Sequence, residues 1–596
     1  MTHALARTGW LAALTVITML GCGRAPAPRD GSTAAAPPPD RDRSSVLFVS
    51  LDTFRADISG SGGHPGGRTP HLDRLARTGT QFRSGLSSSP LTLPSHSTML
   101  TGLTPPAHGV RDNGTFRLPD AVPTLTADLR ERGLRTGAFV AAFPLDERFG
   151  LAQGFEVYDD RVDGAGTAIL MAQRRGDRVA AAAAEWWSSL DPTERTFSWV
   201  HLFDAHTPHD APRPFVQASG QDTYLAEAAY TDRFLGQAVR SAQAAIDDLW
   251  VVLLADHGES RGDHDEATHG LFIYGATIQV PAIIWPAPRE LSPGAHPATF
   301  PTLDLPATVF DLLGLPPDEA PGSGTSRLRG ETAPAYMESL YALYHHGWAP
   351  LMAVQDGRWK YVSAPTPELY DLEMDPGETR NVIDDYPDIA ADLADRVDAL
   401  AAETGEAASE SLDESSRAAL ESLGYVTTTV DVRPDAPDPK RMIHVQNLLE
   451  QAQSQFYSNR FEEALRTLRA ALAKDPNNKD IYQTFGILYT AMGRDSDAAD
   501  SFWKCLELPP HRNDRVPRYE LASAYIRLGR AELAIPHLEK ILQEDVPDAS
   551  TWHNLGVAWE QLGQRDKARV AWQRAVETDP GFELARQALA KSAKGR

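Results

Sequence analysis

The chain has 596 residues, which is long enough for two or more domains, and it carries a formal net charge of −24. A charge this negative argues against a surface built for nucleic acid, which needs clustered lysine and arginine. The two cysteines are Cys22 and Cys505, and we expect no internal disulfide.

The first 22 residues have the layout of an export signal. Arg7 precedes an apolar run over residues 9–20 that is too short to span a bilayer comfortably. Because Gly21-Cys22 closes this run, residues 1–22 resemble a bacterial lipoprotein signal with Cys22 as the lipidated residue; a simply cleaved signal is the alternative. We therefore expect an exported bacterial protein, held at the periplasmic face or outer membrane by a lipid anchor.

Residues 23–44 are rich in alanine and proline and predict a disordered or extended tether. Strand-like and helix-like segments then alternate through residues 45–383, which predicts a three-layer α/β domain. The expected strands cover 46–51, 136–142, 196–203 and 249–254, and the expected helices open at Thr69 and cover 125–132 and 226–245.

Two of the expected strands end in side chains that can bind metals. The run Val46–Leu51 leads into Asp52, and the run Leu249–Leu254 leads into Asp256-His257. Apolar runs of this kind predict buried parallel strands, and ligands bind at the carboxyl ends of such strands. Two carboxylates and an imidazole brought together there can bind a divalent metal.

A loop with a candidate nucleophile lies between these motifs, in residues 90–102. Pro94 favours an extended Leu93, and the residues after it predict a helix with Ser95 as the N-cap. Thr92 would then lie just before a helix N-terminus, where backbone N–H groups favour an anion. The Thr92 hydroxyl is therefore a candidate to attack a phosphate- or sulfate-like centre, and a purely structural threonine is the alternative.

Together these motifs resemble the sulfatase-like members of the alkaline phosphatase superfamily. The similarity rests on three ordered blocks, in residues 51–57, 92–110 and 255–281, and extends over roughly residues 44–430. It implies an alkaline-phosphatase-like three-layer sandwich with a small C-terminal β subdomain in residues 333–383. A helical and linker segment, residues 384–440, would follow.

The sequence departs from this family at the nucleophile. Formylglycine sulfatases have cysteine and arginine where this chain has Thr92 and His96, so the resemblance favours relatives that use threonine directly. Thr92 would then be a metal-activated nucleophile and also a metal ligand beside Asp52, Asp256 and His257. Because an imidazole suits Zn²⁺ or Mn²⁺ better than Ca²⁺, we expect zinc or manganese, as one or two ions.

The resemblance also implies roles for residues outside these blocks. His206 and His269 would either contact the substrate and leaving group or bind a second metal, with Asp204 as a further ligand. Asn113 would donate its amide to a non-bridging substrate oxygen, and His96 is a second candidate substrate contact. An Asn-Gly turn and a loop-capping aspartate are the alternatives for Asn113 and Asp204.

Residues 441–596 repeat with the 34-residue period of tetratricopeptide repeats. The copies predict four helix pairs, with residues 581–594 as a capping helix. The aromatic residues at the repeat positions are expected to form the core between helices, and Cys505 fills a small-residue packing position. Such arrays bind peptides or partner proteins.

These observations predict a metal-dependent hydrolase of sulfate or phosphate esters. Its substrate would be a small molecule or a glycan or lipid ester, and its repeats would bind a protein partner. Two alternatives are a phosphotransferase of the same superfamily and a catalytically degenerate scaffold that acts through its repeats.

Overall fold

A computed structural model describes most of the chain: residues 37–113, 116–161, 174–207, 209–330, 333–403, 433, 435–508, 514–544 and 549–594. The expected signal peptide with Cys22, and the tether up to residue 36, lie outside the described residues. Among the residues described, no helix is both long and apolar enough to cross a membrane.

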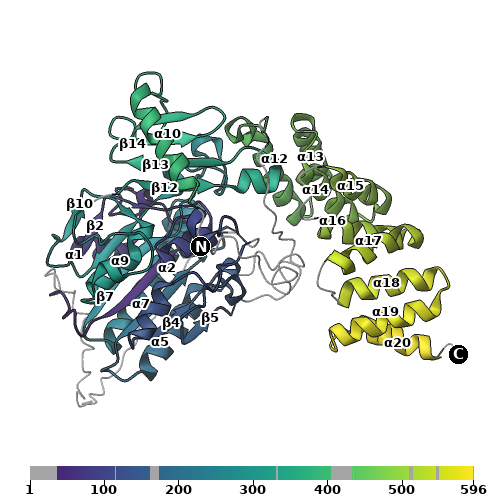
Figure 1. Cartoon of the computed structure of the whole chain (residues 1–596), viewed down its shortest axis with the longest axis horizontal. Helices are drawn as coiled ribbons and strands as arrows, with labels where there is room; N and C mark the ends of the chain where they lie inside the picture. Colours follow the sequence, from purple (N-terminus) through teal and green to yellow (C-terminus); the bar gives the residue numbers. More distant parts are fainter. Residues whose placement is uncertain are drawn as a thin grey trace, which may run out of the picture.

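An eight-stranded mixed sheet forms the centre of the larger domain (Figure 1). Its strand order is β10 (Gly294–His296), β2 (Thr80–Phe82), β9 (Ala282–Trp285), β7 (Leu249–Ala255), β1 (Ser45–Leu51), β6 (Thr196–Leu202), β4 (Arg135–Phe139) and β5 (Val157–Asp159). The central strand β1 pairs in parallel with both β6 and β7. All three strands are buried along their whole length, which explains their largely apolar sequences.

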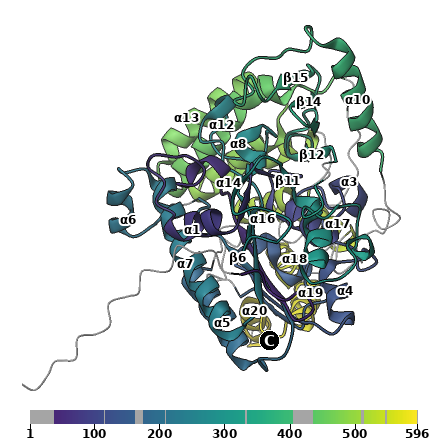
Figure 2. The same ribbon diagram turned by 90° about the vertical axis from the view of Figure 1, so that its left-hand side faces the viewer.

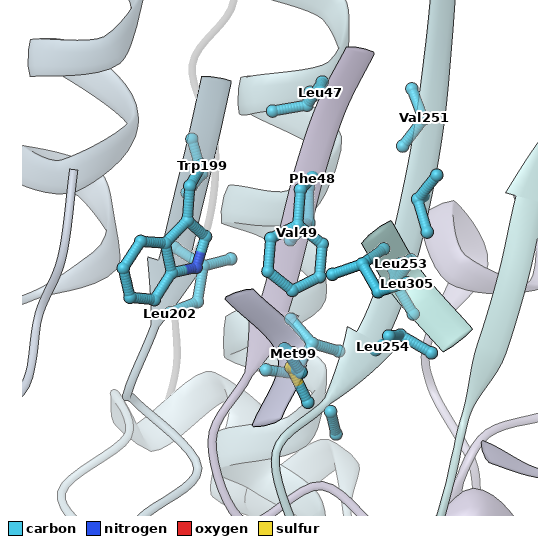
Figure 3. Close-up of a cluster of buried hydrophobic side chains, with 14 of the residues drawn as sticks. Leu47, Phe48, Val49, Met99, Trp199, Leu202, Val251, Leu253, Leu254 and Leu305 are labelled. Carbon is cyan, nitrogen blue, oxygen red and sulfur yellow. The ribbon is translucent and has the colours of Figure 1, made fainter. Parts of the chain in front are cut away.

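Helices cover both faces of this sheet and give the three layers predicted from the sequence (Figure 2). One face carries α1 (Pro70–Thr78), α5 (Gly176–Ser189) and α7 (Thr223–Ala245), and the other carries α2 (Thr92–Thr101), α4 (Leu125–Glu131) and α9 (Leu305–Leu312). Figure 3 shows the second face, where Met99 of α2 and Leu305 of α9 lie against Phe48 of β1. A small sheet, β11 (Phe300–Pro301), β3 (Gly85–Leu86) and β8 (Gln279–Val280), lies beside the main one.

A four-stranded antiparallel sheet forms the predicted small β subdomain. Its strands β12 (Ala335–Ser339), β13 (Leu351–Asp356), β14 (Trp359–Ser363) and β15 (Glu368–Asp371) pair in sequence order. Helix α10 (Pro387–Ala401) packs its buried residues Leu393 and Val397 on this sheet. The first part of the segment 384–440 is therefore a helix, and most of its remainder lies outside the described residues.

The C-terminal region is all helical. In the part that the structure describes, helices pair as α12 (Pro439–Tyr457) with α13 (Phe461–Lys474), α14 (Lys479–Ala491) with α15 (Asp495–Glu507), α16 (Arg515–Arg527) with α17 (Ala531–Glu544), and α18 (Ala549–Gln561) with α19 (Arg565–Thr578). Helix α20 (Glu583–Lys594) packs on the last pair. Figure 1 shows the pairs following one another from α12, beside the sheet domain, to the C-terminus.

Small residues match large ones inside the repeats. A Cβ added at Gly556 would lie 2.4 Å from the Trp572 ring, and one at Gly486 would lie 2.5 Å from the Phe502 ring. The corresponding positions of the other two repeats hold alanine opposite leucine. Cys505 is also buried in this core, and burial raises the pKa of its thiol to about 12, which leaves it unreactive.

Candidate active site

Asp52, Asp256 and His257 meet at the carboxyl ends of two adjacent strands. Leu51 and Ala255 are paired residues of the parallel strands β1 and β7, so the residues after them lie side by side. One ligand atom from each of the three side chains lies within 4.8 Å of the other two, and all three residues are fully buried. The two separated sequence motifs therefore form one cluster.

The chemistry of this cluster fits a divalent cation. Both carboxylate oxygens of Asp52 and the Oδ2 atom of Asp256 are buried without a hydrogen-bond partner among the described residues. Burial raises the pKa of Asp52 and of Asp256 to about 6, because the loss of hydration outweighs the attraction of the neighbouring His257 ring. His257 Nδ1–H donates to the Gly258 carbonyl (3.0 Å), which leaves Nε2 as a free electron pair on the cluster side.

Thr92 is the first residue of helix α2, and its hydroxyl faces the cluster. The Thr92 Oγ1 atom lies 3.5 Å from His257 Nε2. The helix begins four residues earlier than predicted, with Leu91 rather than Ser95 at the N-cap position. Pro94 occupies the first turn, where its missing N–H needs no partner, and the Ser95 hydroxyl instead donates to the Asp256 carbonyl (2.7 Å).

His96 lies beneath the cluster and away from solvent, so the structure does not place it as a substrate contact. Its Nδ1–H donates to the Thr92 carbonyl (2.8 Å), and its Nε2 accepts from the Ser50 hydroxyl (2.9 Å). His96 is one helical turn after Thr92, which points its ring at the sheet.

Ser50 and His201 belong to this buried layer and were missed in the sequence. The Ser50 oxygen also receives Trp199 Nε1–H (2.8 Å) and pairs with His201 Nδ1 (3.0 Å). Because the Ser50 proton goes to His96, His201 must donate from Nδ1, which leaves its Nε2 electron pair 3.5 Å from Asp52 Oδ2. Polar residues inside otherwise apolar strands were the available signal.

His206 and His269 line the outer side of the cluster. The ring centroids of His269 and His257 are 4.5 Å apart, and those of His269 and His206 are 5.2 Å apart. His206 Nδ1–H donates to the Thr207 carbonyl (2.5 Å), so its Nε2 faces the opposite way as an acceptor. Burial lowers the pKa of His206 to about 3 and that of His269 to about 4, so both rings are neutral near pH 7.

Glu259 orients the His269 ring and was also missed, although it follows directly in the third motif. His269 Nδ1 lies 3.2 Å from Glu259 Oε2, and the Glu259 side chain is only 4 % exposed. The other oxygen, Oε1, has no hydrogen-bond partner among the described residues. A carboxylate behind an imidazole fixes the ring's tautomer and orientation.

Asn113 lies at the start of α2, whereas Asp204 faces elsewhere. The Asn113 Oδ1 atom accepts the Leu93 N–H (2.9 Å), which leaves its amide N–H groups available beside Thr92. The Asp204 carboxylate accepts the Gly176 N–H (3.0 Å), at the start of α5, and is not part of the metal-type cluster. The strand-end geometry could not show this, because the partner is a distant helix N-terminus.

Comparison with known proteins identifies the two parts of the chain. Residues 44–315 match the family model described as Sulfatase, and residues 455–501, 518–545 and 549–582 match models described as Tetratricopeptide repeat. Residues 44–315 therefore form a domain similar to sulfatases, hereafter the sulfatase domain, and tetratricopeptide repeats follow it. The predicted fold class is confirmed.

Curated relatives and a solved structure cover the same region. The chain is 24% identical over 412 residues to the Delta 4,5-hexuronate-2-O-sulfatase of Bacteroides thetaiotaomicron, covering 58% of this chain and 85% of the relative. It is 26% identical over 428 residues to the choline-sulfatase of Rhizobium meliloti, covering 56% and 82%. The phosphonate monoester hydrolase of Agrobacterium radiobacter shares the fold, with a TM-score of 0.52, 20% identity and coverage of 61% of this chain and 96% of that one.

Proposed function

We propose that the sulfatase domain is a metal-dependent hydrolase of sulfate or phosphate esters with Thr92 as its nucleophile. The observation that carries this proposal is the Thr92 hydroxyl 3.5 Å from His257, beside a buried cluster whose carboxylate oxygens lack partners among the described residues. The match of residues 44–315 to sulfatases, and the names of the curated relatives, support the same class of reaction.

Asp52, Asp256 and His257 would hold the metal, and His201 Nε2 faces the same space from β6. A bound Zn²⁺ or Mn²⁺ would supply Lewis-acid activation of the Thr92 hydroxyl. We propose one ion rather than two, because Asp204 is committed to the Gly176 N–H. An imidazole in the ligand set favours zinc or manganese over calcium.

The surrounding side chains would bind the ester and release its alcohol. Thr92 is the first residue of α2, so the positive end of the helix dipole favours the ester's negative charge, and the Asn113 amide adds a donor beside it. His269 is neutral in the free protein, and the negative charges of a bound ester and of Glu259 would favour its protonated form. In that form His269 is the candidate proton donor to the leaving oxygen. His206 Nε2 is an acceptor on the same side, placed to take a hydrogen bond from the substrate.

Charge distinguishes the candidate esters. Arg55, Arg111 and Arg261 lie in or beside the three sequence blocks, and each pairs with a carboxylate: Asp263, Glu338 and Asp222 respectively. The Glu259 carboxylate adds negative charge beside His269. A sulfate monoester or a phosphate diester carries one negative charge, whereas a phosphate monoester carries two above pH 6. We therefore expect the singly charged esters to be the better substrates.

Turnover of chromogenic aryl esters tests this function. The full chain, loaded with Zn²⁺ or Mn²⁺, should hydrolyse an aryl sulfate or a bis-aryl phosphate faster than an aryl phosphate monoester. Thr92→Ala should abolish turnover, and Thr92→Ser, which keeps the hydroxyl, should retain part of it. No turnover with any ester and metal, or full activity of Thr92→Ala, would overturn the proposal.

The other parts of the chain fit an exported enzyme. We propose that Cys22 carries the lipid anchor that holds the protein at the periplasmic face or outer membrane. The repeats would engage a protein partner. Metabolic labelling with a fatty acid, compared between the wild type and Cys22→Ser, tests the anchor.

A further inference from the structure

The first helices of the repeat region are built into the sulfatase domain. Residues of one continuous apolar cluster come from both parts, among them Leu271 and Trp348 on one side and Ile443 and Leu449 of α12 on the other. Trp348 Nε1–H donates to Asp475 Oδ2 (3.0 Å), and the Ala349 N–H donates to the Pro437 carbonyl (2.9 Å). A shared core of this kind fixes the orientation of α12 relative to the site.

Helix α12 holds the loop that carries His269. The Thr268 hydroxyl donates to Glu450 Oε1 (3.1 Å), and Asn447 Nδ2–H donates to the Asp265 carbonyl (2.6 Å). The same loop has left-handed backbone at His264 (φ 54°) and Asp265 (φ 64°). Non-glycine residues keep such a conformation only where their surroundings hold it, and α12 provides that support.

The same helix also reaches the Asn113 side of the site. Gln446 Oε1 lies 2.8 Å from His346 Nε2, and Asp480 of α14 lies 3.1 Å from His346 Nδ1. The adjacent His345 contacts Asp112 Oδ2 through Nε2 (2.9 Å). Asp112 in turn accepts the Asn113 N–H (2.9 Å).

Gln446 joins these two paths. Its Oε1 faces His346, and its Nε2–H donates to Glu450 Oε1 (2.9 Å), the atom that also accepts the Thr268 hydroxyl. Gln446 is buried, and the two hydrogen bonds of its amide fix which way the group points. One side chain of the repeat region therefore touches both supports of the active site.

We propose that Glu450 and Gln446 of the first repeat are positioning residues for the ester hydrolase, holding His269 through Thr268 and Asn113 through His346 and His345. The expected effect on kcat rests on the proposed function, whereas the contacts of Glu450 and Gln446 do not depend on it. The repeat region is then part of the catalytic unit as well as a surface for partners. Displacing a catalytic group by about 1 Å is enough to lower turnover by up to about a hundredfold.

Three variants of the full chain test the Glu450 contact. Glu450→Ala removes the acceptor of the Thr268 hydroxyl, Glu450→Gln keeps an acceptor oxygen, and Gln451→Ala changes the exposed neighbour on the same helix. We expect Glu450→Ala to lower kcat by at least about tenfold with KM within about twofold, Glu450→Gln to restore most of kcat, and Gln451→Ala to match the wild type. Thr268→Val should give the same loss, and adding it to Glu450→Ala should cost nothing more.

Hydrogen exchange of the same proteins separates this inference from the proposed function. Glu450→Ala should speed exchange in peptides covering residues 261–270 while leaving α5 unchanged, whether or not any ester is turned over. A wild type without turnover would refute the proposed function, and exchange alone would then decide the inference. Three results would overturn the inference about Glu450. They are unchanged exchange in residues 261–270 of Glu450→Ala, an unchanged kcat in an active Glu450→Ala protein, and a loss of kcat in Glu450→Gln equal to that in Glu450→Ala.

Discussion

Replacing Ser50 by alanine should destabilise the sulfatase domain far more than its size suggests. The change removes a single oxygen, so it leaves almost no cavity. That oxygen, however, is the shared partner of Trp199 Nε1, His201 Nδ1 and His96 Nε2, at 2.8, 3.0 and 2.9 Å. All of these side chains are buried where water does not reach them.

The magnitude follows from counting the groups left without a partner. An unsatisfied buried polar group costs about 1–3 kcal/mol, so three of them should cost about 3 kcal/mol or more. Ser45 provides a matched control on the same strand, because it is equally buried and its hydroxyl has a single partner among the described residues, the Thr196 N–H (2.9 Å). Ser45→Ala should cost about 1–2 kcal/mol, since it leaves one such group.

Urea denaturation followed by tryptophan fluorescence measures both costs, because Trp199 itself lies in the network. The midpoints of Ser50→Ala, Ser45→Ala and the wild type are compared at a common slope. A Ser50→Ala protein no less stable than Ser45→Ala would show that the hydroxyl is not the common partner of these rings, and the inferred tautomer of His201 would then be wrong.

Four further predictions concern charge, metal, catalysis and the repeats. Burial raises the pKa of Glu227 from 4.5 to about 7, so the contribution of its protonated form to folding stability is complete below pH 4.5 and is lost as the pH rises through about 7. Glu227→Gln should therefore flatten the pH dependence of the melting temperature between about pH 4.5 and 7. Chelation should lower the melting temperature, and Zn²⁺ or Mn²⁺ should restore it better than Ca²⁺. His269→Ala should lower kcat by about a hundredfold, and the loss should be smaller for esters with more acidic leaving groups. Glu259→Ala should show the same dependence on the leaving group. An equal loss of kcat for every leaving group would exclude His269 as the proton donor. Gly556→Ala should destabilise the last repeats by about 1–3 kcal/mol, and Trp572→Leu should relieve it in the double variant, as measured by helical circular dichroism; simple additivity would contradict the steric explanation.

The layers of the fold could be predicted because their signals are local. Strand β7 is a continuous apolar run, and β1 is apolar except at Ser45 and Ser50, since both faces of each strand are covered. Their lengths could therefore be read from the sequence. The position of Asp52 beside Asp256 followed from one rule about where parallel strands end. Strand pairing itself did not have to be known, because every parallel strand delivers its next residue to the same edge.

Side-chain direction at that edge could not be predicted, because it depends on partners that are distant in the chain. Asp204 follows a strand as Asp52 does, but the free N–H at the start of α5 captures its carboxylate. Ser95 has the composition of an N-cap, but Pro94 fits inside the helix and the Asp256 carbonyl takes the Ser95 hydroxyl. In each case a hydrogen bond across more than 20 residues decided the outcome.

The connection between the two parts of the chain was hidden for the same reason. The sequence predicted a boundary at residue 441, between an α/β pattern and a helical repeat. Neither pattern indicates that the two parts of the chain contact each other. Gln446 and Glu450 are ordinary residues of a repeat helix, and Thr268 and His346 are ordinary residues of loops. Only their approach in space, 2.8 Å for Gln446 with His346 and 3.1 Å for Thr268 with Glu450, gives them a role. Because a repeat array contacts its neighbours through a few exposed positions per helix, variation at Gln446 and Glu450 would change the sulfatase domain while leaving the repeat pattern intact.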